Sequence, residues 1–258
     1  MAAGAGSEPP VGHGAGPEAV SGATPALVSR GAPGRAIARG LAALIALDMA
    51  LLWAGILVEP RAFGSVGDSA GLIIPTLVLL LFAYVLLYSE VAVTRTAAGI
   101  IRLEAWLGGG YGLLYAALLI AGYLVPTSSL LGEQTGTIAL AALVAACLTA
   151  GFVASRRARD FEASALAGAR GAMIGTLIWT LAYLAVTYLF WGTEAQAQVL
   201  RADGTLAAFS HEEDIELGVF LIRDAQGVVF FQCLVNALLG LLLGLGGGLI
   251  GRLASQRR

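Results

Sequence analysis

Charged residues are scarce in this 258-residue chain, and one basic type is missing altogether. Only 12% of the residues are charged, whereas ordinary soluble domains have about 25%. There is no lysine, so arginine supplies all fifteen basic side chains, and seventeen acidic residues leave a net charge of −2. A surface that binds nucleic acid needs clustered basic residues. This composition therefore excludes nucleic acid as a partner.

Cysteine and histidine are also rare, and neither is placed for chemistry. Cys147 and Cys233 fall inside separate apolar blocks, without the close spacing of a metal or redox motif, and are expected to be small core residues. Both histidines lie outside the apolar blocks, which excludes paired-histidine haem ligation and histidine-based catalysis within them. The chain has no Walker motif and no GxSxG elbow. We therefore predict no cofactor, no metal and no enzymatic activity, since an intramembrane enzyme would have to rely on Asp48 with Glu90 or Glu104.

Apolar residues are abundant and are gathered into long blocks. They make up 58% of the chain, and the mean hydropathy is +0.82. A helix needs about 20 apolar residues to cross a bilayer. The sequence therefore predicts an all-α integral membrane protein, a bundle of six transmembrane helices. The predicted spans are 37–58, 72–93, 105–125, 136–154, 170–191 and 228–250.

The arginines predict the orientation of the spans, because basic residues are enriched in short cytoplasmic segments. With the N-terminus inside, twelve arginines fall in cytoplasmic segments and three, Arg61, Arg201 and Arg223, fall outside. This bias predicts that both termini are cytoplasmic. An alanine- and glycine-rich chain with arginine in place of lysine is typical of a GC-rich genome. We expect a multi-pass protein of a prokaryotic cytoplasmic (inner) membrane.

Two segments outside the spans have distinct compositions. Residues 1–35 contain almost no large apolar side chains and are predicted to be a disordered cytoplasmic tail. The connection 192–227 is predicted to be a small outer cap, because apolar arms flank turn signals at 203–204 and 224–227. We expect two β-hairpins there. The second hairpin competes with the sixth span for residues 228–231.

Asp48 is the most informative single residue. It lies halfway along the first predicted span, where a carboxylate costs about 2.5–3.5 kcal/mol on insertion scales. Such a group should face the bundle interior, a watery cavity or a partner protein. Two interpretations remain open: coupling to a proton or cation, or a neutral aspartic acid that hydrogen-bonds a neighbouring helix.

Other polar residues fall near the depth of Asp48 if each span is centred on the bilayer. No arginine or histidine shares this layer, so a bound ion, a proton or another subunit must balance Asp48, or it stays neutral. The layer is a candidate binding site, although any six helices place some hydroxyl groups there by chance. Its members are Asp48, Tyr84, Tyr115, Thr180 and Asn236.

Small residues recur at the spacing that allows close helix packing. One stripe lies on the first span and another on the last. Both indicate packing within the chain, or docking to a partner helix or a second copy. The stripes are Ala42, Ala46 and Ala50, and Gly240, Gly244 and Gly248.

Two functions are compatible with these features. The first is a transporter or permease component in which Asp48 couples to a proton or cation. The alternative is a non-catalytic structural subunit of a larger membrane complex, in which Asp48 pairs with a cation on another chain. The expected partners are the lipid bilayer and either other membrane subunits or further copies of this chain.

Overall fold

The long helices of this protein have the length and composition of membrane-crossing segments. The computed structural model describes residues 32–64, 66–91, 95–125, 129–211 and 215–256, and within these ranges all regular structure is helical. Six helices are long and apolar enough to cross a membrane, which indicates a multi-pass membrane protein. They are α1 (Ala32–Val58), α2 (Val66–Val91), α3 (Arg95–Leu124), α4 (Ser129–Ala158), α5 (Phe161–Leu189) and α8 (Leu217–Gln256). The shorter helices are η1 (Pro60–Phe63), α6 (Glu194–Ala202) and α7 (Thr205–Phe209).

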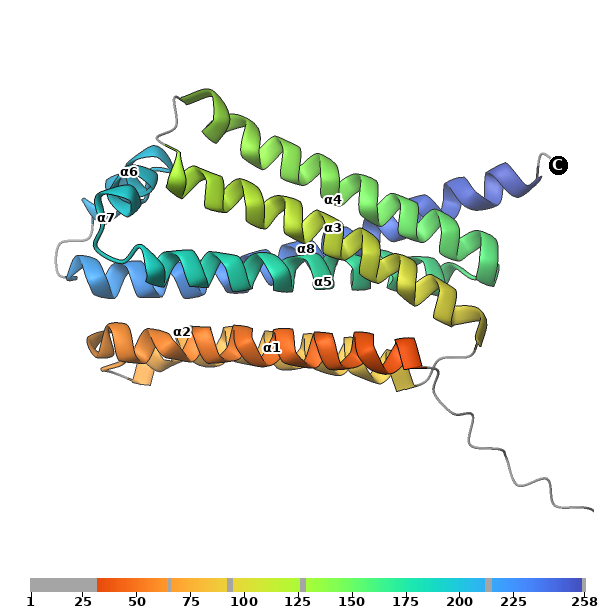
Figure 1. The fold of residues 1–258 in the computed structure, drawn as a ribbon, viewed down its shortest axis with the longest axis horizontal. Coiled ribbons are helices and arrows are strands. Elements are labelled where there is room, and N and C mark those ends of the chain that lie inside the picture. The colour runs from red at the N-terminus through yellow and green to blue at the C-terminus, as the bar shows by residue number, and fades with distance from the viewer. Residues whose placement is uncertain (1–31, 65, 92–94, 126–128, 212–214, 257–258) are drawn as a thin grey trace, which may run out of the picture. The chain divides into compact units, whose positions relative to one another are not determined.

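Helix α5 lies at the centre of the six. In its most apolar stretch, 61% of the residues are buried, compared with 28–39% in the other long helices. It packs against α3, α4 and α8 and also contacts α1. Helices α1 and α2 pair with each other and lie along one side of α5 and α8, while α3 and α4 lie along the other (Figure 1). The residues of α5 are therefore placed to meet side chains from most of the bundle.

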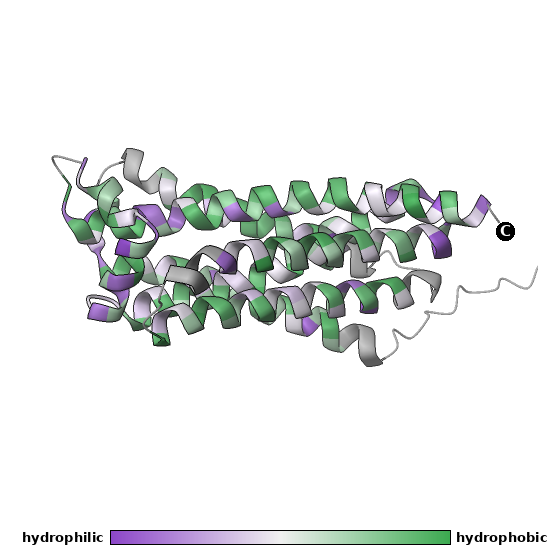
Figure 2. Cartoon of the chain, turned by 90° about the horizontal axis from the view of Figure 1, so that it is seen from above, coloured by the Kyte–Doolittle hydropathy of each residue, from purple (hydrophilic) through white to green (hydrophobic). Residues whose placement is uncertain are grey.

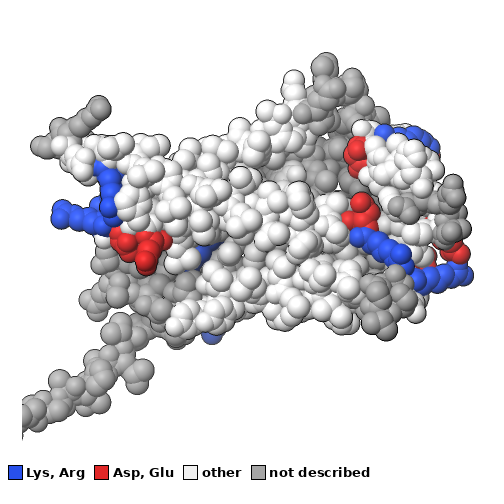
Figure 3. All heavy atoms as spheres, turned by 180° about the vertical axis from the view of Figure 1, so that it is seen from behind, with Lys and Arg blue, Asp and Glu red and all other residues white. Residues whose placement is uncertain are grey.

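Polar residues gather at the two ends of the long helices. Figure 2 shows apolar colouring along most of their length and more polar colouring toward the ends. On the face drawn in Figure 3, a broad band almost free of charge separates charged side chains at the two ends. The start of α1 and the end of α8 lie at one end, and α6 and α7 lie at the other (Figure 1). The band matches the hydrocarbon layer that the helices would cross.

The glycine stripe of α8 packs within the chain. A methyl group at Gly168 of α5 would collide with backbone atoms of Gly240 and Gly244, so these two helices approach backbone to backbone. Gly248, the third residue of the stripe, faces the side chain of Ser164 at similarly close range. In lipid, where apolar burial gives little driving force between helices, this approach supplies van der Waals contact.

The alanine stripe of α1 has a different environment. Ala42, Ala46 and Ala50 are all exposed on the surface of the single chain. The buried residues of α1 include Asp48 and Leu52, one turn apart on the face that points into the bundle. The two predicted stripes are therefore not equivalent, because only the glycine stripe is covered by helices of this chain.

The first predicted β-hairpin of the outer segment is wrong. Its arms are helices α6 and α7. Thr193 caps α6 by accepting a hydrogen bond from the Gln196 N–H at 3.3 Å. Gly204 has a φ of +85° and connects the two helices, so the Asp-Gly turn signal ends one helix and starts the next. The glycine lies in a turn as predicted, but its neighbours are helical.

The second predicted hairpin is also wrong. Residues 219–231 belong to α8, which begins at Leu217 and runs without interruption to Gln256. Gly227 has no positive φ and no crowded neighbour, so the helix passes through it. The competition predicted for residues 228–231 is thus resolved in favour of helix.

Helix ends extend beyond several predicted spans. Helix α5 begins at Phe161 rather than at residue 170, because Asp160 caps it by accepting a hydrogen bond from the Glu162 N–H. Arg170 therefore lies well inside a helix instead of at the start of the predicted span. The predicted tail, residues 1–35, falls mostly on residues 1–31, which lie outside the described ranges, and residues 32–35 are already helical.

The glycine contacts predict a position-specific effect of adding one methyl group. Gly151→Ala should destabilise the protein by about 1–3 kcal/mol, as overpacking does elsewhere, because the methyl group would meet the backbone of Gly244. Gly110→Ala is the matched control, since nothing lies within 4 Å of its methyl position. Thermal unfolding in detergent measures both variants. Equal stability of the two would contradict the backbone contact between α4 and α8.

Candidate functional site

Asp48 lies in the interior of the bundle rather than toward its surface. Its side chain is 0% exposed, and Leu52, one turn further along α1, is 0% exposed as well. Neither carboxyl oxygen of Asp48 has a hydrogen-bond partner among the described residues. A buried polar group without a hydrogen bond is costly, and such groups are uncommon in folded proteins. The aspartate is therefore an exception that calls for a physical reason.

Side chains from two other helices complete the surroundings of Asp48. Cys233 of α8 belongs to the same buried apolar cluster as Ile45 and Leu52, which lie on either side of Asp48 on α1, and as Leu177 and Leu184, which lie on either side of Thr180 on α5. Thr180 is fully buried, and Cys233 nearly so. Asp48, Thr180 and Cys233 thus lie in one part of the core, on α1, α5 and α8, and we call them the Asp48 cluster.

The buried arginine of the described bundle is already paired. Arg170 of α5 forms a salt bridge with Glu104 of α3, with 3.3 Å between nitrogen and oxygen, and both side chains are almost completely buried. Thr180 follows Arg170 by ten residues on the same helix, which corresponds to about 15 Å. The arginine therefore neutralises Glu104 and is too distant to form an ion pair at the Asp48 cluster.

A second polar cluster lies one helical turn away. Asn236 donates hydrogen bonds to the Thr176 hydroxyl oxygen at 3.0 Å and to the Tyr111 hydroxyl oxygen at 3.3 Å. Thr176 in turn donates to the carbonyl oxygen of Ala172 at 2.8 Å. Helices α3, α5 and α8 are thus joined by polar bonds at this level. Unlike Asp48, these groups satisfy one another.

The five residues of the predicted layer occupy different environments. Asp48 and Thr180 lie in the Asp48 cluster, and Asn236 lies in the neighbouring cluster. Tyr84 is 63% exposed and stacks on Tyr88 of the same helix, with 5.3 Å between ring centroids. Tyr115 is partly buried and stacks on Trp179 at 5.4 Å. The structure therefore places Asp48 and Thr180 in the same part of the core and the other three members of the layer elsewhere.

Several residues of these clusters cannot be identified as candidate site residues from the sequence alone. In the sequence, Cys233 has the features of a small core residue, and Tyr111 and Thr176 carry no signal of their own. The spacing offers one clue: Thr176 and Thr180 are four residues apart on α5, and Cys233 and Asn236 are three apart on α8. Such spacings place polar residues on one helix face.

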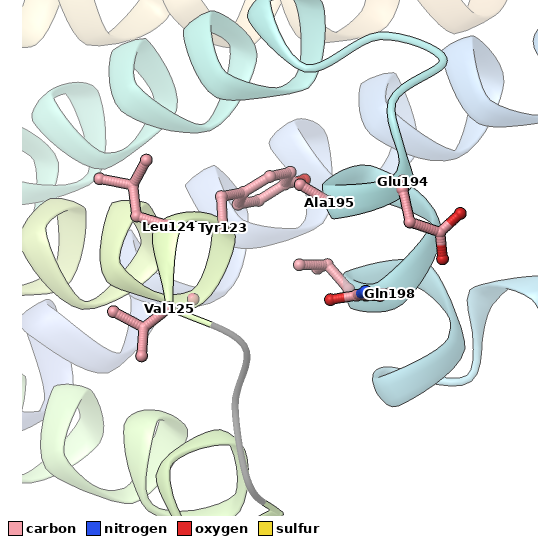
Figure 4. A pocket seen from close by; sticks show the side chains of 8 residues that line it. Tyr123, Leu124, Val125, Glu194, Ala195 and Gln198 are labelled. Atoms are coloured by element: carbon pink, nitrogen blue, oxygen red, sulfur yellow. The ribbon is translucent and has the colours of Figure 1, made fainter.

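A shallow cavity lies elsewhere, near the end of the bundle that carries α6. It has a volume of about 210 Å³ and lies between the last turn of α3 and helix α6 (Figure 4). This volume is below the range of roughly 300–1,000 Å³ that is typical of small-molecule sites. No residue of the Asp48 cluster lines it. Its lining residues are Gly122, Tyr123, Leu124, Val125, Glu194, Ala195, Gln198 and Val199.

The contrast between the two clusters predicts opposite effects of truncation. Asn236→Ala should lower the free energy of unfolding by about 1–3 kcal/mol, because it removes hydrogen bonds between buried groups. Asp48→Ala should leave the free energy of unfolding unchanged or raise it, because the carboxyl group makes no hydrogen bond among the described residues and is costly to bury. Thermal or denaturant unfolding in detergent measures both. If Asp48→Ala lowered the free energy of unfolding as much as Asn236→Ala, the carboxyl group would have to make a stabilising hydrogen bond.

Comparison of the chain with models of known protein families, with curated proteins and with solved structures finds no match.

Proposed function

We propose that this chain is a membrane transporter or permease component in which Asp48 takes up and releases a proton or a small monovalent cation. The supporting observation is the complete burial of an aspartate whose two carboxyl oxygens have no hydrogen-bond partner among the described residues. Ionisable groups inside membrane proteins commonly mark ion pathways and proton relays. No catalytic step is part of this proposal.

The surroundings of Asp48 favour exchange over structural bonding. An aspartic acid that joins helices should bond a group on a neighbouring helix, and neither oxygen of Asp48 does so among the described residues. A proton or bound cation would remove the cost of an uncompensated negative charge. The Thr180 hydroxyl oxygen lies in the same part of the core and also has no hydrogen-bond partner among the described residues. It could serve as a second ligand for a cation.

The orientation predicted from the arginines is part of the same proposal. The start of α1 and the end of α8 lie at the same end of the bundle (Figure 1). We infer that this end faces the cytoplasm of a prokaryotic cell, and that α6 and α7 lie on the outer side. Helix α8 has 40 residues, about 60 Å at 1.5 Å per residue. It would therefore extend beyond a hydrocarbon layer of about 30 Å.

A flux measurement tests the role of Asp48. The purified protein is reconstituted in liposomes, and a potassium diffusion potential drives proton entry, read with an internal pH dye, or entry of radioactive sodium. Asp48→Asn should lower the flux that wild type carries by at least about tenfold, since an amide neither exchanges this proton nor bears the charge.

The control for this experiment is an acidic residue on the surface. Glu162 is exposed in the first turn of α5, so Glu162→Gln should retain wild-type flux. Equal flux in wild type and Asp48→Asn would contradict the proposal. Wild-type flux of both ions no greater than in protein-free liposomes would also contradict it.

A second candidate function is a structural subunit of a membrane complex. The observation that favours it is the exposed stripe of Ala42, Ala46 and Ala50 on α1, since small residues allow close helix contact. Burial of Asp48 argues against a partner's cation reaching that carboxyl group without separation of the helices. On this interpretation α1 would dock through its alanine face instead.

Replacement of the central alanine tests this second candidate. Ala46→Leu should abolish an assembly that wild type forms in mild detergent, because the larger side chain prevents close approach. Native mass spectrometry measures the assembly. Ala117→Leu, at an exposed position of α3, is the control. A wild-type chain that is always monomeric and without partners would contradict this function.

A further inference from the structure

A second buried side chain without a partner lies toward the α6 end of the bundle from Asp48. Gln226 of α8 is 1% exposed, and neither its amide oxygen nor its amide nitrogen has a hydrogen-bond partner among the described residues. A buried amide without partners carries a desolvation cost, as a buried carboxyl group does. Neither the apolar character of the sixth span nor the turn signal at 224–227 explains why a glutamine is buried at this position.

Glycines on two other helices make room for this amide. A methyl group at Gly71 of α2 would lie 3.1 Å from the Gln226 amide oxygen. One at Gly55 of α1 would lie 3.8 Å from the amide nitrogen and 3.1 Å from the Tyr188 hydroxyl oxygen of α5. The amide and the hydroxyl group therefore both lie beside Gly55, where α1, α2, α5 and α8 converge.

The backbone of α2 adds a further oxygen at this level. Pro75 lies inside α2, and proline has no N–H to donate to the carbonyl group four residues earlier, which is that of Gly71. Helix interruptions that release carbonyl groups are a recurring feature of cation sites in transporters. Gly71 is also the residue whose missing side chain accommodates the Gln226 amide.

Gln226 and Asp48 belong to one column of the bundle. Gly55 follows Asp48 by seven residues on α1, and Gln226 precedes Cys233 by seven on α8. Seven residues are about two turns, so each pair shares a helix face at a separation of about 10 Å. The space between the two levels is apolar: Leu52, Leu184 and Val229, all fully buried, belong to the same hydrophobic cluster.

An acidic residue lies at the α6 end of this column. The Glu59 carboxylate lies against α8 at Gly218, where a methyl group would be 2.8 Å from a carboxylate oxygen. Glu59 lies four residues after Gly55, about one helical turn, and Gly218 lies eight residues before Gln226, about two turns. Negative charge at the mouth of a pathway raises the local concentration of cations.

We propose that Gln226, together with the Tyr188 hydroxyl group, forms an outer binding site for a small monovalent cation, sodium or hydronium, on its way to Asp48. Leu52, Leu184 and Val229 form the apolar barrier between the two sites, which a cation passes only when these side chains separate. This proposal rests on the proposed function of Asp48. It adds the direction of entry, from the α6 end, and the residues that line the route.

Cys233 allows a direct test, because it lies about two turns beyond Gln226 on α8, on the Asp48 side of the barrier. Silver ion is a monovalent cation that binds thiols, and it is added to the α6 side of reconstituted protein. The protein is then denatured and treated with an alkylating reagent. A thiol that has bound silver is protected from alkylation, and mass spectrometry measures the protected fraction. Cys147→Ala leaves Cys233 as the single thiol. Cys233→Ala leaves Cys147, which is equally buried at 1% but lies in a different apolar cluster.

Silver should protect Cys233 at least about tenfold faster than Cys147. In the protein with Cys233 alone, Gln226→Leu should slow protection by about tenfold, the effect of losing roughly 1.4 kcal/mol from one polar contact. Gly71→Ala, which places a methyl group against the amide oxygen, should slow it as well. Gln226→Glu keeps an oxygen ligand and should retain rapid protection.

Equal rates at the two cysteines, or a Cys233 rate unaffected by both Gln226→Leu and Gly71→Ala, would overturn the outer site. Unchanged unfolding temperatures of these variants show that the comparison is made on folded protein. The result is independent of the flux experiment. If Asp48→Asn carries normal flux but Cys233 remains accessible through Gln226, the route stands and the role of Asp48 fails.

Discussion

Close approach of helix backbones through glycine is the constraint on which the rest of this bundle depends. Gly108 and Gly112 of α3 lie against Gly171 and Gly175 of α5, and Gly168 on α5 lies against α8. These contacts hold three helices close enough for short polar side chains to reach one another. The hydrogen bonds from Asn236 to Tyr111 and Thr176 are a consequence, since larger residues at the helix crossings would separate the donors from the acceptors.

The polar groups along α5 differ in how completely they are satisfied. Toward the start of the helix, Arg170 is paired with Glu104, and at Thr176 the hydrogen bonds to α8 and α3 are made. From Thr180 onward the pattern changes, because the Asp48 carboxyl group and the Gln226 amide have no such partners among the described residues. Burial without compensation costs free energy. Residues that lower stability in this way are typical of sites where function opposes stability.

Much of the architecture is predictable because lipid imposes long apolar helices, and long apolar blocks are visible in any sequence. Asp48 can be singled out from the sequence for the same reason, because a carboxyl group is conspicuous in the middle of a long apolar block. The outer segment is not predictable by the same reasoning: Asp203-Gly204 signals a turn, but the flanking residues form helices α6 and α7 because Thr193 provides a cap and glycine a left-handed connection. Cys233 and Gln226 cannot be predicted as site residues, because their roles depend on which residues of α1 and α2 face them, and the sequence does not show how the helices pack.

The same contacts indicate which helices can move to expose Asp48. Helices α3, α4, α5 and α8 meet through glycine backbones, and separating such surfaces sacrifices many short contacts at once. At Gly55 and Gly71, α1 and α2 meet their neighbours through side chains instead, namely those of Tyr188, Ile222 and Gln226. Side chains change rotamer more readily than packed backbones change spacing. Opening the column therefore costs least if the α1–α2 pair shifts against the other four helices, and Asp48, which is carried by α1, would shift with it.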